Sequence, residues 1–248
     1  MKKLSDIIRP FIRRFGIDIV GFNDRVNSAK HIEIRDKIMP FTVTSTERVN
    51  GLLDAVKYII ANGIEGSFVE CGVFKGGSTM AMAYMLNELN IKDRDIYLYD
   101  TYSGMTEPRE LDVSMHGEVA SEKFKNKAIK QDNTFWCYSG IDEVKKNVFS
   151  TGYPEDNFKF IKGKVEDTIP ENTPDKIALL RLDTDWYEST KHELIHLFPK
   201  IVKNGVLIID DYGHWEGARK AVDEYIEENN IMILLNKLDY SGRIGIKS

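Results

Sequence analysis

The sequence predicts an α/β protein in which a doubly wound, mostly parallel sheet carries helices on both faces. Short apolar runs of strand length alternate with longer segments of helical periodicity, which is typical of parallel sheets. Two of these apolar runs end in acidic residues, at position 183 and at positions 210–211, as expected where buried strands reach the carboxyl edge of such a sheet. A length of 248 residues suits one domain of this kind.

The first 45 residues, punctuated by Pro10 and Pro40, are predicted to form an N-terminal helical arm, and residues 46–248 are predicted to form the domain. The arm begins with basic residues, but charges interrupt every apolar stretch before it reaches the length of a signal-peptide core. A basic amphipathic arm suits packing or dimerisation, so we expect a homodimer, with contact to a membrane surface as the alternative.

Each element of the domain is predicted from its periodicity and length. The first helix, at 46–62, has apolar residues at helical spacing, including Val49, Leu52 and Val56. The elements that follow are a strand at 67–71, a helix at 77–90, strands at 95–99, 158–161 and 177–182, a helix at 187–202, a strand at 206–209, a helix at 215–228 and closing strands at 231–235 and 243–247. The stretch 101–157 is too long for a simple connection and is rich in glycine, serine and charge, so it is predicted to form a lid over the active edge.

Composition and charge argue against several classes of protein. A net charge of −5 and a pI near 5.6 are unlike those of a protein that wraps nucleic acid. The two cysteines, Cys71 and Cys137, imply no disulfide framework, which favours a reducing compartment and a cytoplasmic location. No run of about 18 apolar residues occurs, so no integral membrane segment is expected.

Three acids follow two of the predicted strands: Asp183 after one, Asp210 and Asp211 after the other. Adjacent parallel strands would bring these carboxylates to one place. That much negative charge is costly without a cation, and hard oxygen ligands suit Mg²⁺ or Ca²⁺ rather than a soft metal. Asp185 is expected to cap the helix that begins near Tyr187. The alternative is that all these acids lie on a solvated strand edge or cap helices.

A glycine-rich turn at 70–78 joins the strand at 67–71 to the next helix. Glycines in such a turn let the backbone approach a ligand closely, although the G-x-G-x-x-G fingerprint of dinucleotide sites is absent. Asp100, at the end of the second strand, is placed to accept hydrogen bonds from two ribose hydroxyls. Either feature alone suits an ordinary connection, but together, one βα unit apart, they indicate a nucleoside site.

The segment 192–196 reads H-E-L-I-H and matches H-E-x-x-H, the helix signature of zinc proteases. The apolar residues of this predicted helix form one stripe, and His192 and His196 fall on the opposite side, which faces solvent in a doubly wound fold. We therefore expect no zinc site here. His214 follows the acid pair closely and is expected either to lie near the substrate or to be an ordinary loop residue.

Five segments, in order, resemble the macrocin O-methyltransferase family: FVECGVFKGGS, YLYDTYSGM, GKVEDTIP, LLRLDTDWYEST and GVLIIDDYGHWEGARKAVDEY. The resemblance covers roughly residues 46–230. It implies a seven-stranded class I methyltransferase sheet of Rossmann-like type, S-adenosyl-L-methionine as methyl donor with S-adenosyl-L-homocysteine as product, and Mg²⁺. It also implies a sugar hydroxyl as acceptor, as in antibiotic and polysaccharide biosynthesis.

The resemblance further implies roles for single residues. The positions are Glu70, Gly72, Gly76 and Ser78 for the methionine part of the cofactor, Asp100 for its ribose, Val165 and Glu166 for its adenine, and Asp183, Asp210 and Asp211 for the metal. Asp183 would also be the general base. The related catechol-type methyltransferases have a lysine base three residues after the first acid; that position is Trp186 here, so the lysine mechanism is not available.

The expected function is Mg²⁺-dependent transfer of a methyl group to a sugar hydroxyl of a natural product or surface glycan precursor. A sugar hydroxyl is a poor nucleophile because its pKa is high; a bound cation lowers that pKa and a nearby carboxylate accepts the proton. One alternative is a metal-dependent hydrolase that uses Asp183, Asp210 and Asp211. Another is a non-catalytic nucleotide-binding protein on the same fold. We expect no nucleic-acid partner and no integral membrane segment.

Overall fold

The computed structural model describes residues 28–248 except residues 128, 131–132 and 135. The first 27 residues of the predicted arm lie outside the described residues. The rest of that arm forms α2 (Ala29–Ile38) and the 3-10 turn η3 (Met39–Phe41). Within the described residues, no helix has the length and apolar character needed to cross a membrane.

Among the described residues, seven strands form one sheet in the order β5-β2-β1-β6-β7-β9-β8. The strands are β1 (Ser67–Cys71), β2 (Ile96–Asp100), β5 (Phe158–Lys162), β6 (Ile177–Leu182), β7 (Ile201–Ile209), β8 (Asn236–Lys237) and β9 (Arg243–Ile246). The first five in the sheet order are parallel, whereas β9 runs antiparallel to both β7 and β8. The predicted fold class, a mostly parallel seven-stranded α/β sheet, is confirmed.

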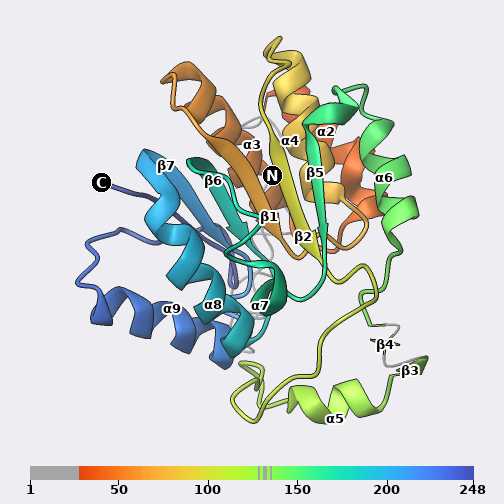
Figure 1. Ribbon diagram of the computed structural model, residues 1–248, viewed down its shortest axis with the longest axis vertical. Coiled ribbons are helices and arrows are strands. Elements are labelled where there is room, and N and C mark those ends of the chain that lie inside the picture. Colours follow the sequence, from red (N-terminus) through yellow and green to blue (C-terminus); the bar gives the residue numbers. More distant parts are fainter. Residues whose placement is uncertain (1–27, 128, 131–132, 135) are drawn as a thin grey trace, which may run out of the picture.

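Helices cover both faces of the sheet (Figure 1). One layer holds α2, α3 (Thr46–Ala61), α4 (Gly77–Glu88) and α6 (Ile141–Phe149), and the other holds α7 (Val165–Thr168), α8 (Tyr187–Leu197) and α9 (Glu216–Glu228). Side chains alternate along β1: Phe68 belongs to the first hydrophobic cluster, and Val69 and Cys71 belong to the second. Both faces of β1 are therefore covered, and four of its five residues are buried.

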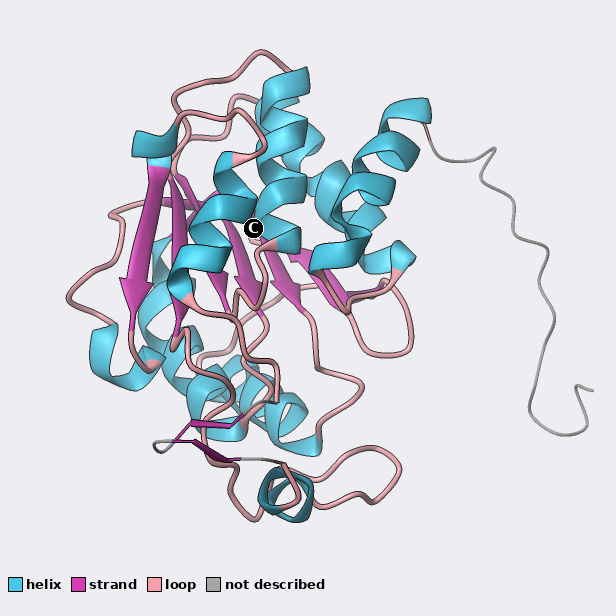
Figure 2. Cartoon of the chain, turned by 90° about the vertical axis from the view of Figure 1, so that its right-hand side faces the viewer, coloured by secondary structure: helices cyan, strands magenta, loops and turns pink. Residues whose placement is uncertain are grey.

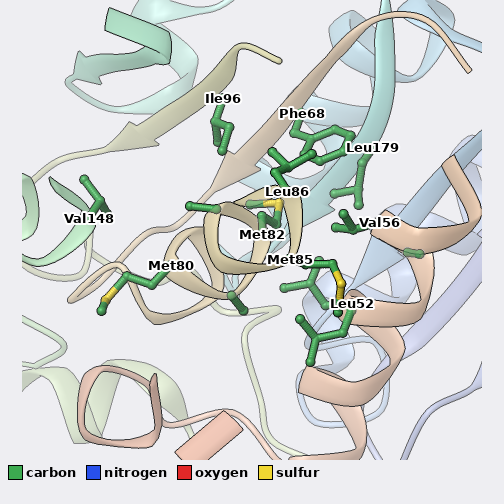
Figure 3. Close-up of a cluster of buried hydrophobic side chains, with 14 of the residues drawn as sticks. Leu52, Val56, Phe68, Met80, Met82, Met85, Leu86, Ile96, Val148 and Leu179 are labelled. Carbon is green, nitrogen blue, oxygen red and sulfur yellow. The ribbon is translucent and has the colours of Figure 1, made fainter. Parts of the chain in front are cut away.

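The first cluster centres on α4, which is buried on almost every side (Figure 3). Met82 and Leu86 of α4 are fully buried, and Phe68 of β1, Val56 of α3 and Leu179 of β6 are fully buried in the same cluster. Each such side chain stabilises the fold by roughly 1.5–3 kcal/mol relative to exposure. This packing fixes the N-terminus of α4, and with it the glycine turn, against the end of β1.

Two predicted elements at the C-terminal end of the sheet differ from the structure. The predicted helix 187–202 ends at Leu197; a 3-10 turn, η5 (Phe198–Lys200), follows, and β7 already begins at Ile201. Pro199 in that turn cannot continue the helix ladder. The predicted strand 231–235 is wrong, since these residues form no strand and Met232 and Leu234 are 87% and 83% exposed. The edge strand is the two-residue β8 instead.

The predicted lid segment divides into two parts. α5 (Ala120–Lys125) and the hairpin of β3 (Ile129–Lys130) and β4 (Asn133–Thr134) lie beyond the arrowheads of the parallel strands (Figures 1 and 2). The later helix, α6, packs instead in the first helical layer through Val144 and Val148. The part of the segment that covers the carboxyl edge therefore ends before α6.

Gly72, at the end of β1, packs against the backbone that follows β6. It has φ +83°, and a Cβ added there would overlap the carbonyl oxygen of Asp183. We predict that Gly72→Ala lowers the free energy of unfolding by about 2–4 kcal/mol in urea titrations, because the left-handed backbone and the overlap are both unfavourable. The matched control is Gly117→Ala, at φ +80° with nothing within 4 Å of an added Cβ, which carries only the backbone strain of about 1–2 kcal/mol. Equal losses in the two variants would contradict the close approach.

Candidate active site

The acids that follow β6 and β7 lie side by side because these strands are parallel neighbours. Leu182 pairs with Ile209, so the next residues, Asp183 and Asp210, leave the sheet together. The amide of Asp183 donates to the carbonyl of Cys71 at 2.8 Å, and that of Asp210 donates to Leu182 at 2.9 Å. The hydrogen-bond ladder of the sheet thus continues one residue beyond the strands and fixes the backbone positions of both acids.

Three carboxylates form a compact cluster at this edge. Oxygen atoms of Asp183, Asp185 and Asp211 all lie within 4.8 Å of one another. Burial raises the pKa of Asp183 and of Asp211, and raises that of Asp185 to about 7, although a hydrogen bond with Asp211 opposes the shift at Asp185. Asp211 Oδ2 is buried without a hydrogen-bond partner. The cluster therefore combines high local negative charge with unused ligand atoms.

The expected capping role of Asp185 is wrong. The N-cap residue of α8 is Trp186, and no side chain of that residue caps the helix. The first amide of the helix, that of Tyr187, donates instead to Asp112 Oδ1 of the lid at 2.9 Å. Asp185 has φ +68°, a left-handed conformation that turns it back toward the cluster. The sequence does not reveal this backbone conformation, and an aspartate close to the start of a helix is commonly an N-cap.

Asp210 has a different environment from Asp211. Its Oδ1 accepts a hydrogen bond from Arg181 Nη2 at 2.6 Å, and its Oδ2 is paired with Arg48 Nη1 of α3. The guanidinium of Arg181 also donates to Glu70 at 2.8 Å and to Asp183 at 2.7 Å. Burial opposes the charge on Arg181, but the three carboxylates hold its pKa above the ordinary value. Both oxygens of Asp210 are therefore engaged by guanidinium groups.

Two adjoining cavities open at the carboxyl edge, with volumes of about 270 and 60 Å³. They share Gly72, Asp100, Gly104, Met105 and Asp183. Of the expected cofactor residues, Glu70 and Ser78 line the larger cavity, Val165 and Glu166 line the smaller, and Gly72 and Asp100 line both. Gly76 lines neither of the two; it is the N-cap of α4 at φ +88°, where an added Cβ would approach Val148 to 3.0 Å.

Asp100 is held by backbone amides at the junction of the two cavities. Its Oδ2 accepts from the amides of Val73 and Phe74 at 2.7 and 3.1 Å, and its Oδ1 accepts from that of Tyr102 at 2.6 Å. Burial raises the pKa of Asp100, and these hydrogen bonds oppose the rise. The carboxylate thus fixes the glycine turn and the start of the lid relative to each other.

Aromatic residues from the lid and from the loop after β7 line part of the larger cavity. Trp136 and Trp215 line it and pack against Trp186, with ring centroids 5.1–6.3 Å apart. Trp186 Nε1 donates to the carbonyl of Thr106 at 3.0 Å, which ties the lid to the start of α8. Tyr240, from the loop before β9, completes the wall.

The H-E-x-x-H segment forms no metal site among the described residues, where the acid cluster is the one group of potential ligands. His192 Nε2 instead contacts the carbonyl oxygen of Ile169 at 3.0 Å. Glu193 is fully buried, and its Oε1 accepts from the hydroxyl of Thr184 at 3.0 Å. The inward position of Glu193 could not be predicted from the sequence pattern, which indicates only the apolar stripe of the helix.

The antiparallel strand β9, the glycine turn after β1, the acid at the end of β2 and the acid cluster beyond β6 and β7 are features of a class I methyltransferase. Within that class, the chain belongs to the macrocin O-methyltransferase family, whose model matches residues 22–244. It is therefore an S-adenosylmethionine-dependent O-methyltransferase, and the predicted family is confirmed. Membership of this family argues against the hydrolase and against the non-catalytic nucleotide-binding protein.

Curated relatives and a solved structure agree with this assignment. The chain is 30% identical over 201 residues to demethyldecarbamoylnovobiocin O-methyltransferase from Streptomyces niveus, covering 81% of this chain and 73% of the relative. It is 28% identical over 206 residues to 8-demethyl-8-(2,3-dimethoxy-alpha-L-rhamnosyl)-tetracenomycin-C 4'-O-methyltransferase from Streptomyces olivaceus, with 81% and 73% covered. The structure of the O-methyltransferase NovP superposes with a TM-score of 0.73 at 27% identity, over 84% of this chain and 82% of that one.

The buried carboxyl group of Glu193 on α8 predicts a pH dependence of the free energy of unfolding. Burial raises its pKa above 4.5, so the folded state binds the proton more tightly than the unfolded state. The stability that the protonated side chain provides is complete below pH 4.5 and falls as the pH rises toward the folded pKa, by up to about 1.4 kcal/mol per pH unit. Glu193→Gln, which keeps the acceptor for Thr184, is predicted to lose less unfolding free energy than wild type between pH 5 and 8.

Urea titrations at several pH values measure this difference, and comparison with wild type removes the contribution of the other buried acids. The control is Glu171→Gln at an exposed position, for which we expect the wild-type pH dependence. A Glu193→Gln variant that follows the wild-type curve would show that Glu193 is ionised in the folded protein.

Proposed function

We propose that this enzyme transfers the methyl group of S-adenosylmethionine to a sugar hydroxyl of a natural product or surface glycan precursor, with a divalent cation held by the acid cluster. The observation that carries the proposal is the position of Asp183, which lines both cavities and belongs to the cluster. A hydroxyl oxygen at the cluster would thus lie next to the space available to a cofactor.

A sugar acceptor is supported by the relatives and by the walls of the larger cavity. The name of the Streptomyces olivaceus relative specifies a rhamnosyl sugar as the site of methylation. In this chain, part of the larger cavity is lined by Trp136, Trp215 and Tyr240 together with carboxylates. Aromatic faces and a few convergent polar groups are the usual surroundings of a bound sugar ring.

The cofactor would occupy the smaller cavity and the adjoining part of the larger one. In this arrangement Val165 and Glu166 contact the adenine and Asp100 lies at the ribose, with Gly72 close to the methionine part. Gly72 allows close approach because it has no side chain. Glu70 acts indirectly in this proposal, since its carboxylate is already bonded to Arg181 and to the hydroxyl of Thr79.

The donor set suits a hard divalent cation such as Mg²⁺, because three carboxylates converge and one of their oxygens is buried without a partner. Asp183 and Asp211 belong both to the set implied by family resemblance and to the geometric cluster. We propose Asp185 as the third ligand, in place of Asp210, whose two oxygens are engaged by Arg48 and Arg181. When bound, the cation lowers the pKa of the acceptor hydroxyl.

The residues of the chain then have two tasks, to orient the reactants and to accept a proton. Alignment of the acceptor oxygen with the methyl group depends on the rigid ends of β1, β6 and β7. Asp183 is the proposed base, as the family resemblance implies, because it lies between the two cavities. Arg181 holds one of its oxygens at 2.7 Å, which leaves the other free to face the acceptor.

The proposal is tested first by isothermal titration with S-adenosylhomocysteine, with and without EDTA. We expect binding in both conditions, because the cation serves the acceptor, and methyl transfer to p-nitrophenyl glycosides only without EDTA. Failure to bind the cofactor product would contradict the proposed cofactor site. Undiminished transfer in EDTA would contradict the proposed role of the cation.

The ligand set is tested with Asp185→Asn and Asp210→Asn. Loss of a charged ligand is expected to weaken Mg²⁺ binding by about tenfold to a hundredfold in Asp185→Asn, an estimate in line with the cost of disturbing metal-site residues. Asp210→Asn is expected to lose stability, because it leaves Arg48 and Arg181 without a charged partner, while Mg²⁺ affinity changes less. Titration of Mg²⁺ in the presence of S-adenosylhomocysteine measures the Mg²⁺ affinity of both variants, with exposed Asp142→Asn as control. The reverse order of effects would favour Asp210 as the third ligand.

A further inference from the structure

His214 lines the larger cavity together with Asp185 and Asp211, and the mechanism proposed above does not use it. Its backbone is firmly placed relative to the cluster. The amide of His214 donates to the carbonyl of Asp211 at 3.0 Å, and its own carbonyl accepts from the amide of Met115 in the lid at 2.8 Å. The imidazole also packs edge-on against Trp215, with centroids 4.8 Å apart.

The imidazole has a single side-chain hydrogen-bond partner among the described residues. The hydroxyl of Tyr240 lies 3.3 Å from His214 Nδ1. A phenol hydroxyl can donate or accept, but it is the stronger as a donor, so this contact favours the tautomer in which Nδ1 accepts and Nε2 carries the hydrogen. No hydrogen bond of the described residues involves Nε2. A residue that lines the cavity thus has a donor available to a ligand.

The loop that carries Tyr240 is anchored to the same edge of the sheet. Gly213 donates to the carbonyl of Ser241 at 2.9 Å, and the hydroxyl of Ser241 donates to the carbonyl of Asp210 at 2.7 Å. A Cβ on Gly213 would overlap the carbonyl oxygen of Tyr240, so a glycine is required for this approach. Arg48 holds Asp239 of the loop at 2.9 Å. Tyr240 is therefore positioned by contacts that also position the acids.

His214 is half-buried and lies near several charged side chains. Burial lowers the pKa of His214, and Lys123 and His116 lower it further, against an opposing effect of Glu118. Arg48, from α3, also lowers the pKa of His214. With Tyr240 at Nδ1, Nε2 carries a hydrogen both in this tautomer and in the charged ring, so Nε2 is a donor in either state.

We propose that His214 is a specificity-determining residue of the acceptor site, which donates a hydrogen bond from Nε2 to an oxygen of the bound sugar, and that Tyr240 is the positioning residue that fixes the tautomer. The proposal rests on the proposed function, since the ligand is the sugar acceptor. A site that donates to a substrate oxygen discriminates against analogues in which that oxygen is missing. Within this cavity, the acids would thus act at the reacting hydroxyl and His214 at another oxygen of the same sugar.

The tautomer is tested first, by ¹⁵N nuclear magnetic resonance of the histidine side chains in the cofactor-product complex. His214→Gln assigns the His214 signals. We expect the hydrogen on Nε2 in wild type and a mixture of the two tautomers in Tyr240→Phe. Hydrogen on Nδ1 and none on Nε2 would overturn the proposal without bearing on the methyl transfer itself.

Recognition is tested by steady-state transfer from S-adenosylmethionine to those p-nitrophenyl glycosides that wild type methylates. His214→Ala is expected to raise KM for the glycoside about tenfold, the effect of one neutral hydrogen bond, with kcat changed less than threefold. His214→Gln, whose amide also donates, is expected to recover part of the loss. Tyr240→Phe is expected to fall between wild type and His214→Ala. Affinity for S-adenosylhomocysteine should stay within twofold of wild type in all three.

His196→Gln on α8 and Tyr84→Phe on α4, both half-buried and outside the lining of the larger cavity, serve as controls and are expected to match wild type. An unchanged KM in His214→Ala would overturn the proposal. Loss of kcat by about a thousandfold with KM unchanged would also overturn it, because that result identifies a general base. If wild type binds the cofactor but methylates none of the glycosides, the sugar acceptor of the proposed function fails, and this role of His214 fails with it.

Discussion

The carboxyl edge of this sheet depends on one buried guanidinium, that of Arg181. It contacts Glu70 of β1, Asp183 at the end of β6 and Asp210 at the end of β7, and so joins three neighbouring strands. Three carboxylates buried together without a cation would repel one another and lose their hydration. Removal of one partner of such a buried network typically costs about 3–5 kcal/mol. The hydroxyl of Thr79 extends the network to α4, so the charge pairing also fixes the helix behind the glycine turn.

The network divides the acids at this edge into two kinds. Asp210 is neutralised by Arg181 and Arg48 and takes a structural position between the sheet and α3. Asp185 and Asp211 are hydrogen-bonded to each other rather than to a guanidinium. Asp183 lies close to both, so the three carboxyl groups form one cluster. Since Arg181 and Arg48 already neutralise Asp210, added positive charge is most favourable beside Asp183, Asp185 and Asp211, which line the larger cavity.

The features of the fold that depend on local sequence patterns could be predicted. The parallel strands, the position of the glycine turn and the ends of β6 and β7 follow from apolar runs that stop at glycine or acid. The partners of the acids were not predictable, because Arg48 lies 162 positions before Asp210 and only the folded sheet brings the two together. One signal was available: Arg181 is the single charged residue in the otherwise apolar strand 177–182, and a charge there must find a buried partner. Asp185 was misassigned because its left-handed backbone is not visible in the sequence.

The same distinction separates the two ends of the site. The expected cofactor end is built from turns that directly follow β1, β2 and β5, so its residues lie at predictable places in the βα pattern. The acceptor end is assembled from segments that are far apart in the chain: residues 41–44, the lid, the loop after β7 and the loop before β9. The contacts of Arg181 are made to residues of the strands and of their ends, so variation in the side chains of these loops leaves those contacts in place. A fold of this kind therefore allows acceptor specificity to change in the loops while the geometry of the cofactor and the acids is retained.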